Sequence, residues 1–224
     1  MRKIWLMIAG LMLTIFISGC GTSGSTLHFT AAENVDNEEA KEAVSSILSL
    51  LEMEGSVSSS EGEVTATLNE DISSSQKETL QKKLEEGIDL SFRDFNDKKM
   101  LGEKDLVAGT AEVSTRKDLD TASIAVQMKD KEHFHEITKD IANRENGKKQ
   151  LVIWINYEDN QSFKEEKDKE NPAYVSAPRV STPLNTESVQ IAGSFSEEEA
   201  KELVQKINIA TWLHFVELES IDTK

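Results

Sequence analysis

The histidines and carboxylates at residues 132–136 form the cluster in this sequence whose composition is closest to a metal site. His133 and His135 stand two residues apart, with Glu132 and Glu136 on either side. On a helix, residues i and i+2 point about 200° apart, so the two imidazoles cannot bind one ion. Glu132 could share a face with His135 or Glu136, but two ligands make a poor site without a third. We therefore interpret this segment as a solvated helix face and predict no metal site.

The common catalytic motifs are absent from the sequence. It contains no Gly-x-Ser-x-Gly, no Gly-Lys-Ser/Thr and no His-Glu-x-x-His, and the other two histidines, His28 and His214, stand alone. Asp94 and Asp97 are typical turn residues. The grouped glutamates lie at expected helix ends or in a charged loop, where capping and solubility explain them: residues 85–86, 165–166 and 197–199. We predict a protein that is not an enzyme and uses no cofactor.

A cysteine near the N-terminus indicates a different chemistry, covalent lipidation. Met1-Arg2-Lys3 is followed by an uncharged apolar run from Ile4 to Ile17, which is shorter than the ~20 residues of a spanning helix but typical of a signal peptide. Ile17-Ser18-Gly19-Cys20 resembles the bacterial lipobox, in which the cysteine is acylated, for example with palmitate, and becomes the mature N-terminus. The alternative is a plain secretory leader with an incidental cysteine. Two or three acyl chains on Cys20 would hold the protein stably at a membrane.

The charge of the chain excludes some partners. The 224 residues carry a formal charge of −16. Removal of Arg2 and Lys3 with the leader leaves 23 basic and 41 acidic residues, a charge of −18. Such an acidic body repels phosphate backbones and anionic headgroups, so we predict no binding to nucleic acid.

Periodicity in the first half predicts a β-α-β-β-α-β order. We expect a short strand at 27–29, a helix from 37 to 54, a hairpin from 57 to 68 that turns at Glu61-Gly62, a helix capped by Ser75 and Glu78, and a strand at 88–92. This order resembles a ferredoxin-like module.

Beyond a polar break at 95–105 the pattern predicts a second α+β module. Strands are expected at 109–115 and 121–128, a helix at 130–143 capped by Asp130, and a helix after 196 capped by Ser196 and Glu199. Residues 151–155 lack alternation, which favours a central strand covered on both faces. Residues 174–180 and 189–195 are expected to pair with each other in one sheet with 151–155, and Trp212–Leu218 to form a last strand.

An edge of this second module is a candidate for binding a polypeptide. Trp154, Trp212 and Phe195 fit core positions, whereas Tyr157, Phe163 and Tyr174 border the charged loop at 162–171. Aromatic side chains beside an uncovered strand edge could accept an extended chain by strand addition. Arg179 is either an inward-pointing charge that blunts the edge or a contact for a ligand carboxylate, and we favour the first interpretation.

Three collinear stretches resemble a known family. They are Leu-Ser-Phe-Arg-Asp-Phe-Asn-Asp-Lys at 90–98, Gln-Leu-Val-Ile-Trp-Ile at 150–155, and the run from Val175 through Leu-Asn-Thr at 184–186 to Val-Gln-Ile-Ala-Gly-Ser-Phe-Ser-Glu-Glu-Glu-Ala-Lys-Glu-Leu at 189–203. Together they are similar to the first extracytoplasmic domain of the SecD/SecDF protein-export family. The sequence departs from the family at 207–212, where relatives carry an Asn-Ala-Gly-x-Leu-Pro turn, and it lacks their Asp-Leu-Gln-Gly-Gly strand.

The resemblance implies an α+β fold in which a head is inserted into a ferredoxin-like base. In the family, this domain holds emerging preproteins and swings about a hinge, driven by proton flow through membrane helices that have no counterpart in this sequence. The expected division is a lipoprotein signal peptide at 1–19, a flexible tether at 20–26, a base-like part at 27–94, a head-like part at 95–210, and a return strand and tail at 211–224.

The resulting hypothesis is a lipid-anchored binding module on the outer face of the cytoplasmic membrane of a Gram-positive bacterium. It would act passively in the export or folding of secreted chains, with unfolded secretory proteins or Sec translocon components as partners. The alternative is a cell-envelope adaptor that uses the export-domain fold to bind another protein.

Overall fold

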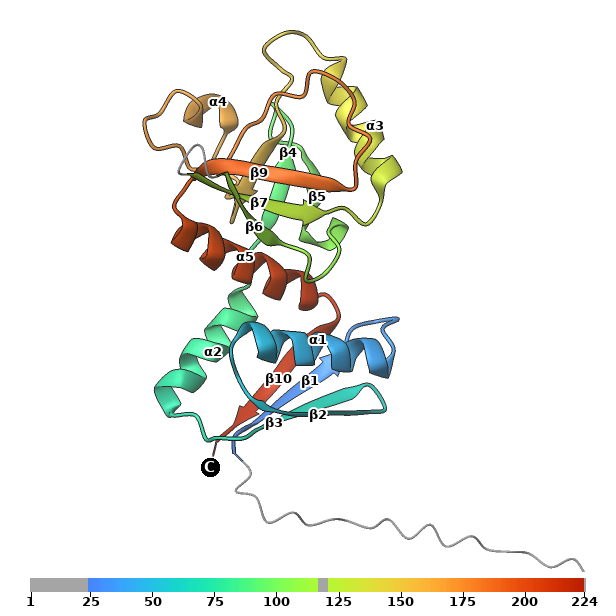
Figure 1. Cartoon of the computed structure of the whole chain (residues 1–224), viewed down its shortest axis with the longest axis vertical. Helices are drawn as coiled ribbons and strands as arrows, with labels where there is room; N and C mark the ends of the chain where they lie inside the picture. The colour runs from blue at the N-terminus through green and yellow to red at the C-terminus, as the bar shows by residue number, and fades with distance from the viewer. Residues whose placement is uncertain (1–23, 117–120, 224) are drawn as a thin grey trace, which may run out of the picture.

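The computed structural model describes residues 24–116 and 121–223. The predicted signal peptide, Cys20 and most of the tether lie outside these residues. Figure 1 shows two bodies stacked along the long axis, which we call the base and the head, with α5 between them. Helices and antiparallel sheets occur in both bodies, which confirms the predicted α+β class.

The base is a four-stranded antiparallel sheet with two helices. Its strands stand in the order β10-β1-β3-β2, which is the order of a ferredoxin-like fold. Leu27 and Phe29 of β1 and Val64 and Ala66 of β3 alternate with polar residues, so one face of the sheet is buried. The elements are β1 (Thr26–Ala31), α1 (Asn37–Leu50), β2 (Gly55–Ser60), β3 (Glu63–Leu68), α2 (Ser74–Glu86) and β10 (Val216–Asp222).

The head contains two three-stranded sheets around one apolar core. The sheets have the orders β5-β4-β8 and β6-β7-β9, and all their pairs are antiparallel. Phe92, Ile124, Phe134 and Ile191 from four different elements meet in this core with at most 1% of their surface exposed. The elements are β4 (Leu90–Arg93), β5 (Lys99–Gly102), a 3-10 turn η1 (Glu103–Asp105), β6 (Glu112–Arg116), β7 (Thr121–Gln127), α3 (Lys131–Ala142), β8 (Val152–Ile155), α4 (Phe163–Glu166), β9 (Ser188–Phe195) and α5 (Glu197–Trp212).

Helix α5 belongs to the cores of both bodies. Ala200, Leu203 and Ile207 lie in the head core, as the i, i+3, i+7 spacing predicts. Ile209 is buried in the base core, and Trp212 packs against that core from the same end of the helix. In Figure 1, α5 lies below β6 and above α1. One continuous helix therefore fixes the head relative to the base.

A buried asparagine fastens α5 to the head. Asn208 is 5% exposed; its Nδ2 donates to the carbonyl oxygen of Ala111 and its Oδ1 accepts from the Ala111 N–H, both at 2.9 Å. Thr211 Oγ1 accepts a further bond from the N–H of Gly109. A side chain at Gly109 would meet the Trp212 ring within about 3 Å, and its φ of +72° also favours glycine. These contacts satisfy the backbone hydrogen-bonding groups of Gly109 and Ala111, which precede β6.

Most local sequence signals are confirmed. The β2–β3 hairpin turns at Glu61-Gly62, Asp130 caps α3, and Ser196 forms a capping box with Glu199. The cap of α2 was predicted wrongly: Ser73 is the N-cap and Gln76 closes the box, two residues before the predicted pair. Ser73 with Gln76 and Ser75 with Glu78 both have the spacing of a capping box. The cap at Ser73 makes the helix two residues longer, so more of its backbone groups form hydrogen bonds.

Several strand pairings differ from the prediction. The strand at 88–92 was assigned to the base, but β4 pairs with β5 and β8 in the head, and β10 takes the fourth place in the base sheet. The segment at 174–180 does not pair with β9, which pairs with β7 in the other head sheet. Strand β8 is the last named strand of its sheet, but residues 175–180 form isolated bridges along its outer edge, so it lies between β4 and that segment as expected. Val152, Ile153 and Trp154 are fully buried, as the lack of alternation predicts.

The predicted last strand begins four residues late because α5 is longer than expected. Residues 207–212, where the resemblance predicted a turn, are the last turns of the helix, and β10 begins at Val216. Ile207, Ile209 and Ala210 are buried, so packing on both bodies stabilises the helix at these residues. The bounds proposed for the five parts of the chain stay a prediction.

An ion pair closes the side of the head away from the base. Arg144 donates to Asp94 at 2.8 Å and to Asp140 at 2.7 Å, and the side chain of Asp94 is only 5% exposed. Burial by itself raises the pKa of Asp94, but the bonds from Arg144 and from the N–H groups of Asn96 and Lys98 outweigh it and lower the pKa below 3.8. The charged form of Asp94 therefore stabilises the folded head.

We expect Asp94→Asn to destabilise the protein by about 2 kcal/mol at neutral pH, because a partly buried Arg144 loses its buried counter-ion and keeps only the exposed Asp140. Since the folded pKa is depressed, the contribution is present above the unfolded value of 3.8 and is lost as pH falls through the folded pKa. Urea midpoints of wild type and variant should converge below about pH 3.8. The control is Glu145→Gln, which removes an exposed ion pair and should change little. A constant difference down to pH 2 would contradict the assignment.

Candidate functional site

The aromatic residues beside the charged loop form a small core of their own. Trp154 is fully buried and contacts Tyr157 and Tyr174 edge-on, with ring centroids 5.1 and 5.8 Å apart. Phe163, 4% exposed, contacts Tyr174 at 5.3 Å and Phe95 at 5.7 Å. Such edge-to-face pairs stabilise the packing beyond the area they bury. Tyr157 and Tyr174 keep part of their surface exposed, whereas Phe163 and Trp154 are buried, and the ring contacts hold the loop against the head.

The charged loop at 162–171 contacts the head where it begins, and most of its charged side chains face solvent. Asp97 Oδ1 accepts from the N–H of Phe163, and the Arg93 guanidinium lies 3.5 Å from the centre of the Tyr157 ring. Partial burial raises the pKa of Tyr157, and the nearby Asp97 carboxylate adds to this rise. The side chains predicted to be solvated are exposed, except that of Glu166, which accepts from the N–H of Ala173. The loop is therefore a structural cover, and Asp97 is the turn residue we expected.

The outer edge of β8 is covered by the chain itself. The N–H of Ile153 donates to Ser176 O at 2.7 Å, the N–H of Val175 donates to Ile153 O at 2.8 Å, and the N–H of Leu151 donates to Pro178 O at 3.0 Å. Arg179 extends this segment, is exposed, and donates to the side chain of Asn146. Arg179 is thus not the inward-pointing charge that we favoured. No second chain can add at β8 without displacing residues 175–180.

Strand β9 pairs with β7 alone and ends its sheet, so its outer edge forms no ladder with another described strand. At the start of this edge, the Thr186 hydroxyl accepts from the N–H of Ser188 at 3.1 Å and donates to the Ser188 carbonyl oxygen at 2.9 Å. Val189 and Ile191 point into the core, whereas Ser188, Gln190 and Ala192 are exposed. Figure 1 shows β9 lying across the head beside β7. The strand Ser188–Phe195 contains no charged residue and no proline, which are the usual protections of an edge.

One end of this edge is blocked by a bulge. Ala122 pairs with Phe195 while Ser123 pairs with Ala192, so Gly193 and Ser194 are extra residues in β9. Bulges disturb the ladder and discourage further pairing. Because Thr186 occupies the backbone groups of Ser188, residues 189–192 remain as the regular part of the edge. The sequence signal that could have identified this edge is the eight-residue run without charge, which we had assigned to a hairpin.

The histidines of the 132–136 cluster do not form a binding site. His135 Nδ1 lies 3.1 Å from the carbonyl oxygen of Leu184, and His133 is exposed on the same helix. Across 24–116 and 121–223 no three potential metal ligands lie close together. Leu184, 38% exposed, is the one large apolar side chain in the exposed class among these residues. The candidate binding feature of the head is therefore the backbone edge of β9.

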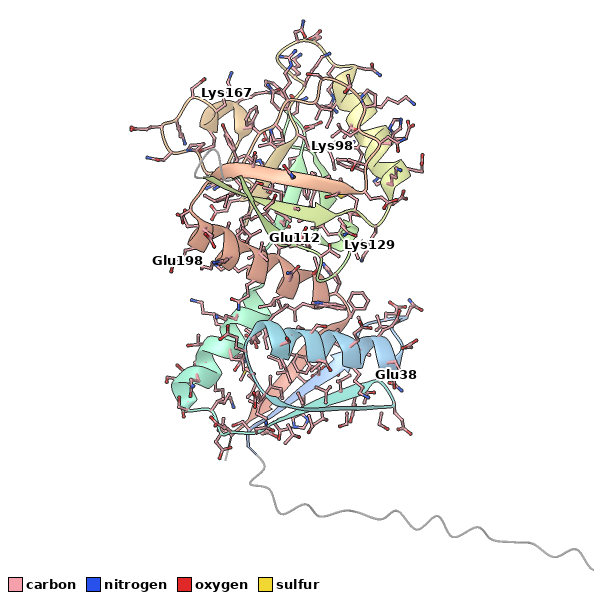
Figure 2. The ribbon with its side chains drawn as sticks, in the orientation of Figure 1. Glu38, Lys98, Glu112, Lys129, Lys167 and Glu198 are labelled. Carbon is pink, nitrogen blue, oxygen red and sulfur yellow. The ribbon has the colours of Figure 1, made fainter. Side chains whose placement is uncertain are left out.

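Figure 2 shows that charged side chains project from the base, the head and the ends of α5 alike. The labelled Glu38 lies on α1, Glu198 on α5 and Lys98 in the head. Acidic residues exceed basic ones, 41 to 25 in the whole sequence, which opposes binding of a polyanion.

Comparison with known proteins identifies the head. Residues 91–210 match the family described as SecDF, P1 head subdomain. The chain is also 42% identical over 119 residues to the protein translocase subunit SecDF of Bacillus subtilis (strain 168). That alignment covers 53% of this chain and 16% of the relative, so the chain corresponds to a small part of that protein.

Two solved structures share the fold over both bodies. One is a structure of SecDF described as a membrane component that enhances protein export; it has a TM-score of 0.55 at 13% identity and covers 89% of this chain and all of the matched chain. The other is SecDF in a super-membrane-facing form, with a TM-score of 0.53 at 13% identity, covering 90% of this chain and 30% of the matched one. The family match extends over more than half of the sequence, and the chain therefore belongs to the SecDF P1 head family.

Proposed function

We propose that this protein is a lipid-anchored module on the outer face of the bacterial cytoplasmic membrane that binds extended segments of secreted chains during export or folding. The observation that carries the proposal is the unprotected β9 edge, which lies within the part of the chain that matches the SecDF head. The relationship to a protein translocase subunit supports a role in protein transport.

The β9 edge suits an unfolded client because its contacts would be made by the backbone. Main-chain hydrogen bonds are available from any sequence in extended conformation, so strand addition gives affinity with little selectivity. The exposed Ser188, Gln190 and Ala192 add neither charge nor bulk at this edge. A module that serves many secreted proteins needs this tolerance.

The proposed mode of action is passive holding. Within the described residues no helix has the length and apolar character needed to cross a bilayer. The cores of the base and the head share α5, which resists a swing of one against the other. The cysteine motif at 17–20 supports attachment by acyl chains on Cys20.

The anchor is tested by Cys20→Ser. This substitution removes the acylated thiol, so the protein should appear in the culture medium and should no longer incorporate labelled palmitate, whereas the unsubstituted chain stays with the membrane. Fractionation with metabolic labelling measures both. Retention of Cys20→Ser on the membrane without label would contradict lipid anchoring through this residue.

The binding edge is tested by charges placed on β9. Gln190→Lys with Ala192→Lys should weaken binding of a reduced, carboxymethylated secretory protein at least tenfold, about 1.4 kcal/mol, because lysines on an edge oppose strand pairing. Fluorescence anisotropy of the labelled client measures the affinity. The matched control is Ser56→Lys with Ser58→Lys on β2. This strand is also an uncharged edge, but it lies in the base, outside residues 91–210 that match the head family, and the two substitutions change the net charge equally.

Three outcomes separate the candidate functions. Loss of binding in the β9 variant alone supports the proposal. Equal binding by wild type and both variants removes β9 as the edge. Failure of the wild type to bind any unfolded client, together with capture in cells of one folded envelope protein, would replace export assistance with the adaptor function.

A further inference from the structure

A pocket of about 460 Å³ lies where the base meets the head. It is bounded by the C-terminal half of α2, by α5, and by the residues that follow β8. Figure 1 shows the C-terminal end of α2 rising to α5 at this place. A volume in this range is typical of sites for small ligands.

The floor of the pocket is apolar. Leu203 belongs to the head core, and Ile88 and Ile155, both partly buried, pack against that core. Ile209 comes from the base core on the same helix as Leu203. An apolar group in the pocket would therefore contact both bodies at once, and its removal from water would stabilise the complex.

The rim carries one cation without a close partner. The acidic groups are already bonded: Glu202 pairs with Lys206 at 2.6 Å, and Glu199 accepts from the N–H and hydroxyl of Ser196 at 2.8 Å. Lys83 makes no hydrogen bond within the described residues and interacts with Glu202 only at longer range. Its charge is therefore available to a ligand.

An amide donor lies on the head side of the same rim. Asn156 Oδ1 accepts from the N–H of Asp89 at 2.9 Å, which fixes the orientation of the amide and leaves its Nδ2 to donate. Lys83 comes from the base and Asn156 from the head, and both line the pocket. Two donors above an apolar floor match a compact anionic head on an apolar body.

We propose that this junction pocket binds a small amphipathic carboxylate of the fatty-acid class. The alkyl chain lies on the isoleucine and leucine floor, and the carboxylate lies between Lys83 and Asn156. A ligand with a single carboxylate is preferred to a polyanion, because the protein itself is strongly acidic. The bound ligand bridges α2 and α5 and so braces the base against the head. This site is separate from β9 and does not depend on the proposed function.

The proposal is tested by titrating decanoate, below its micellar concentration, into the full chain carrying Cys20→Ser. Calorimetry should give a dissociation constant of about 0.1 mM, a value expected for a ligand of this size. Methyl NMR shifts should be confined to Leu203, Ile209 and their neighbours. Decanol lacks the carboxylate and acetate lacks the alkyl chain, so both should bind more weakly than decanoate.

Two variants localise the site. Lys83→Ala should weaken decanoate at least fivefold and leave decanol unchanged, whereas Lys201→Ala, on α5 outside the pocket, should have no effect. Thr79→Trp places an indole at an exposed position of the rim and should weaken decanoate and decanol together. These variants leave the β9 edge unchanged, so a failure here is distinct from a failure of client binding.

The outcomes decide the proposal. Saturable binding with the expected pattern supports it. Equal affinity for decanol and decanoate, unchanged by Lys83→Ala, overturns the carboxylate site. Absence of binding, or binding that Thr79→Trp does not weaken, overturns the pocket altogether.

Discussion

The structure depends on the burial of two consecutive parts of one helix in two different cores. Leu203 and Ile207 of α5 pack in the head, and Ile209, less than one turn further on, packs in the base. Asn208 lies between them and satisfies both backbone groups of Ala111. A bend of the head on the base would break α5, or it would expose the side chains that α5 buries in one of the two cores. Both changes cost free energy, because a close-packed interior and a buried hydrogen bond are lost.

This constraint explains why residues 207–212 are helical, where the resemblance to the family predicted a turn. Glycine and proline, which the predicted turn contains, would end the helix. Ile207-Asn208-Ile209-Ala210-Thr211-Trp212 contains neither residue, and all six positions are helical. The continuous helix also keeps the β9 edge in a fixed position relative to the base.

The elements were largely predictable from sequence, but their partners were not. The capping box at Ser196, the cap at Asp130 and the turn at Glu61-Gly62 are local signals, and they were located correctly because their energetics involve neighbouring residues. Pairing partners are decided by packing between distant segments, so β4 was placed in the wrong body and β9 beside the wrong strand. The Asp94–Arg144 pair, 50 residues apart, had no sequence signal beyond two charges. The open edge and the junction pocket follow from these long-range pairings and therefore required the structure.

The central claim, that α5 makes the base and head one rigid body, is tested most directly by a spin-label distance between them. In the Cys20→Ser chain, cysteines introduced at the exposed Ser58 of β2 and Glu132 of α3 carry one label on each body. Double electron–electron resonance should give one narrow distance distribution that an unfolded client does not change. Two populations, or a broad distribution that narrows when the client binds, would contradict a rigid junction and indicate a working hinge.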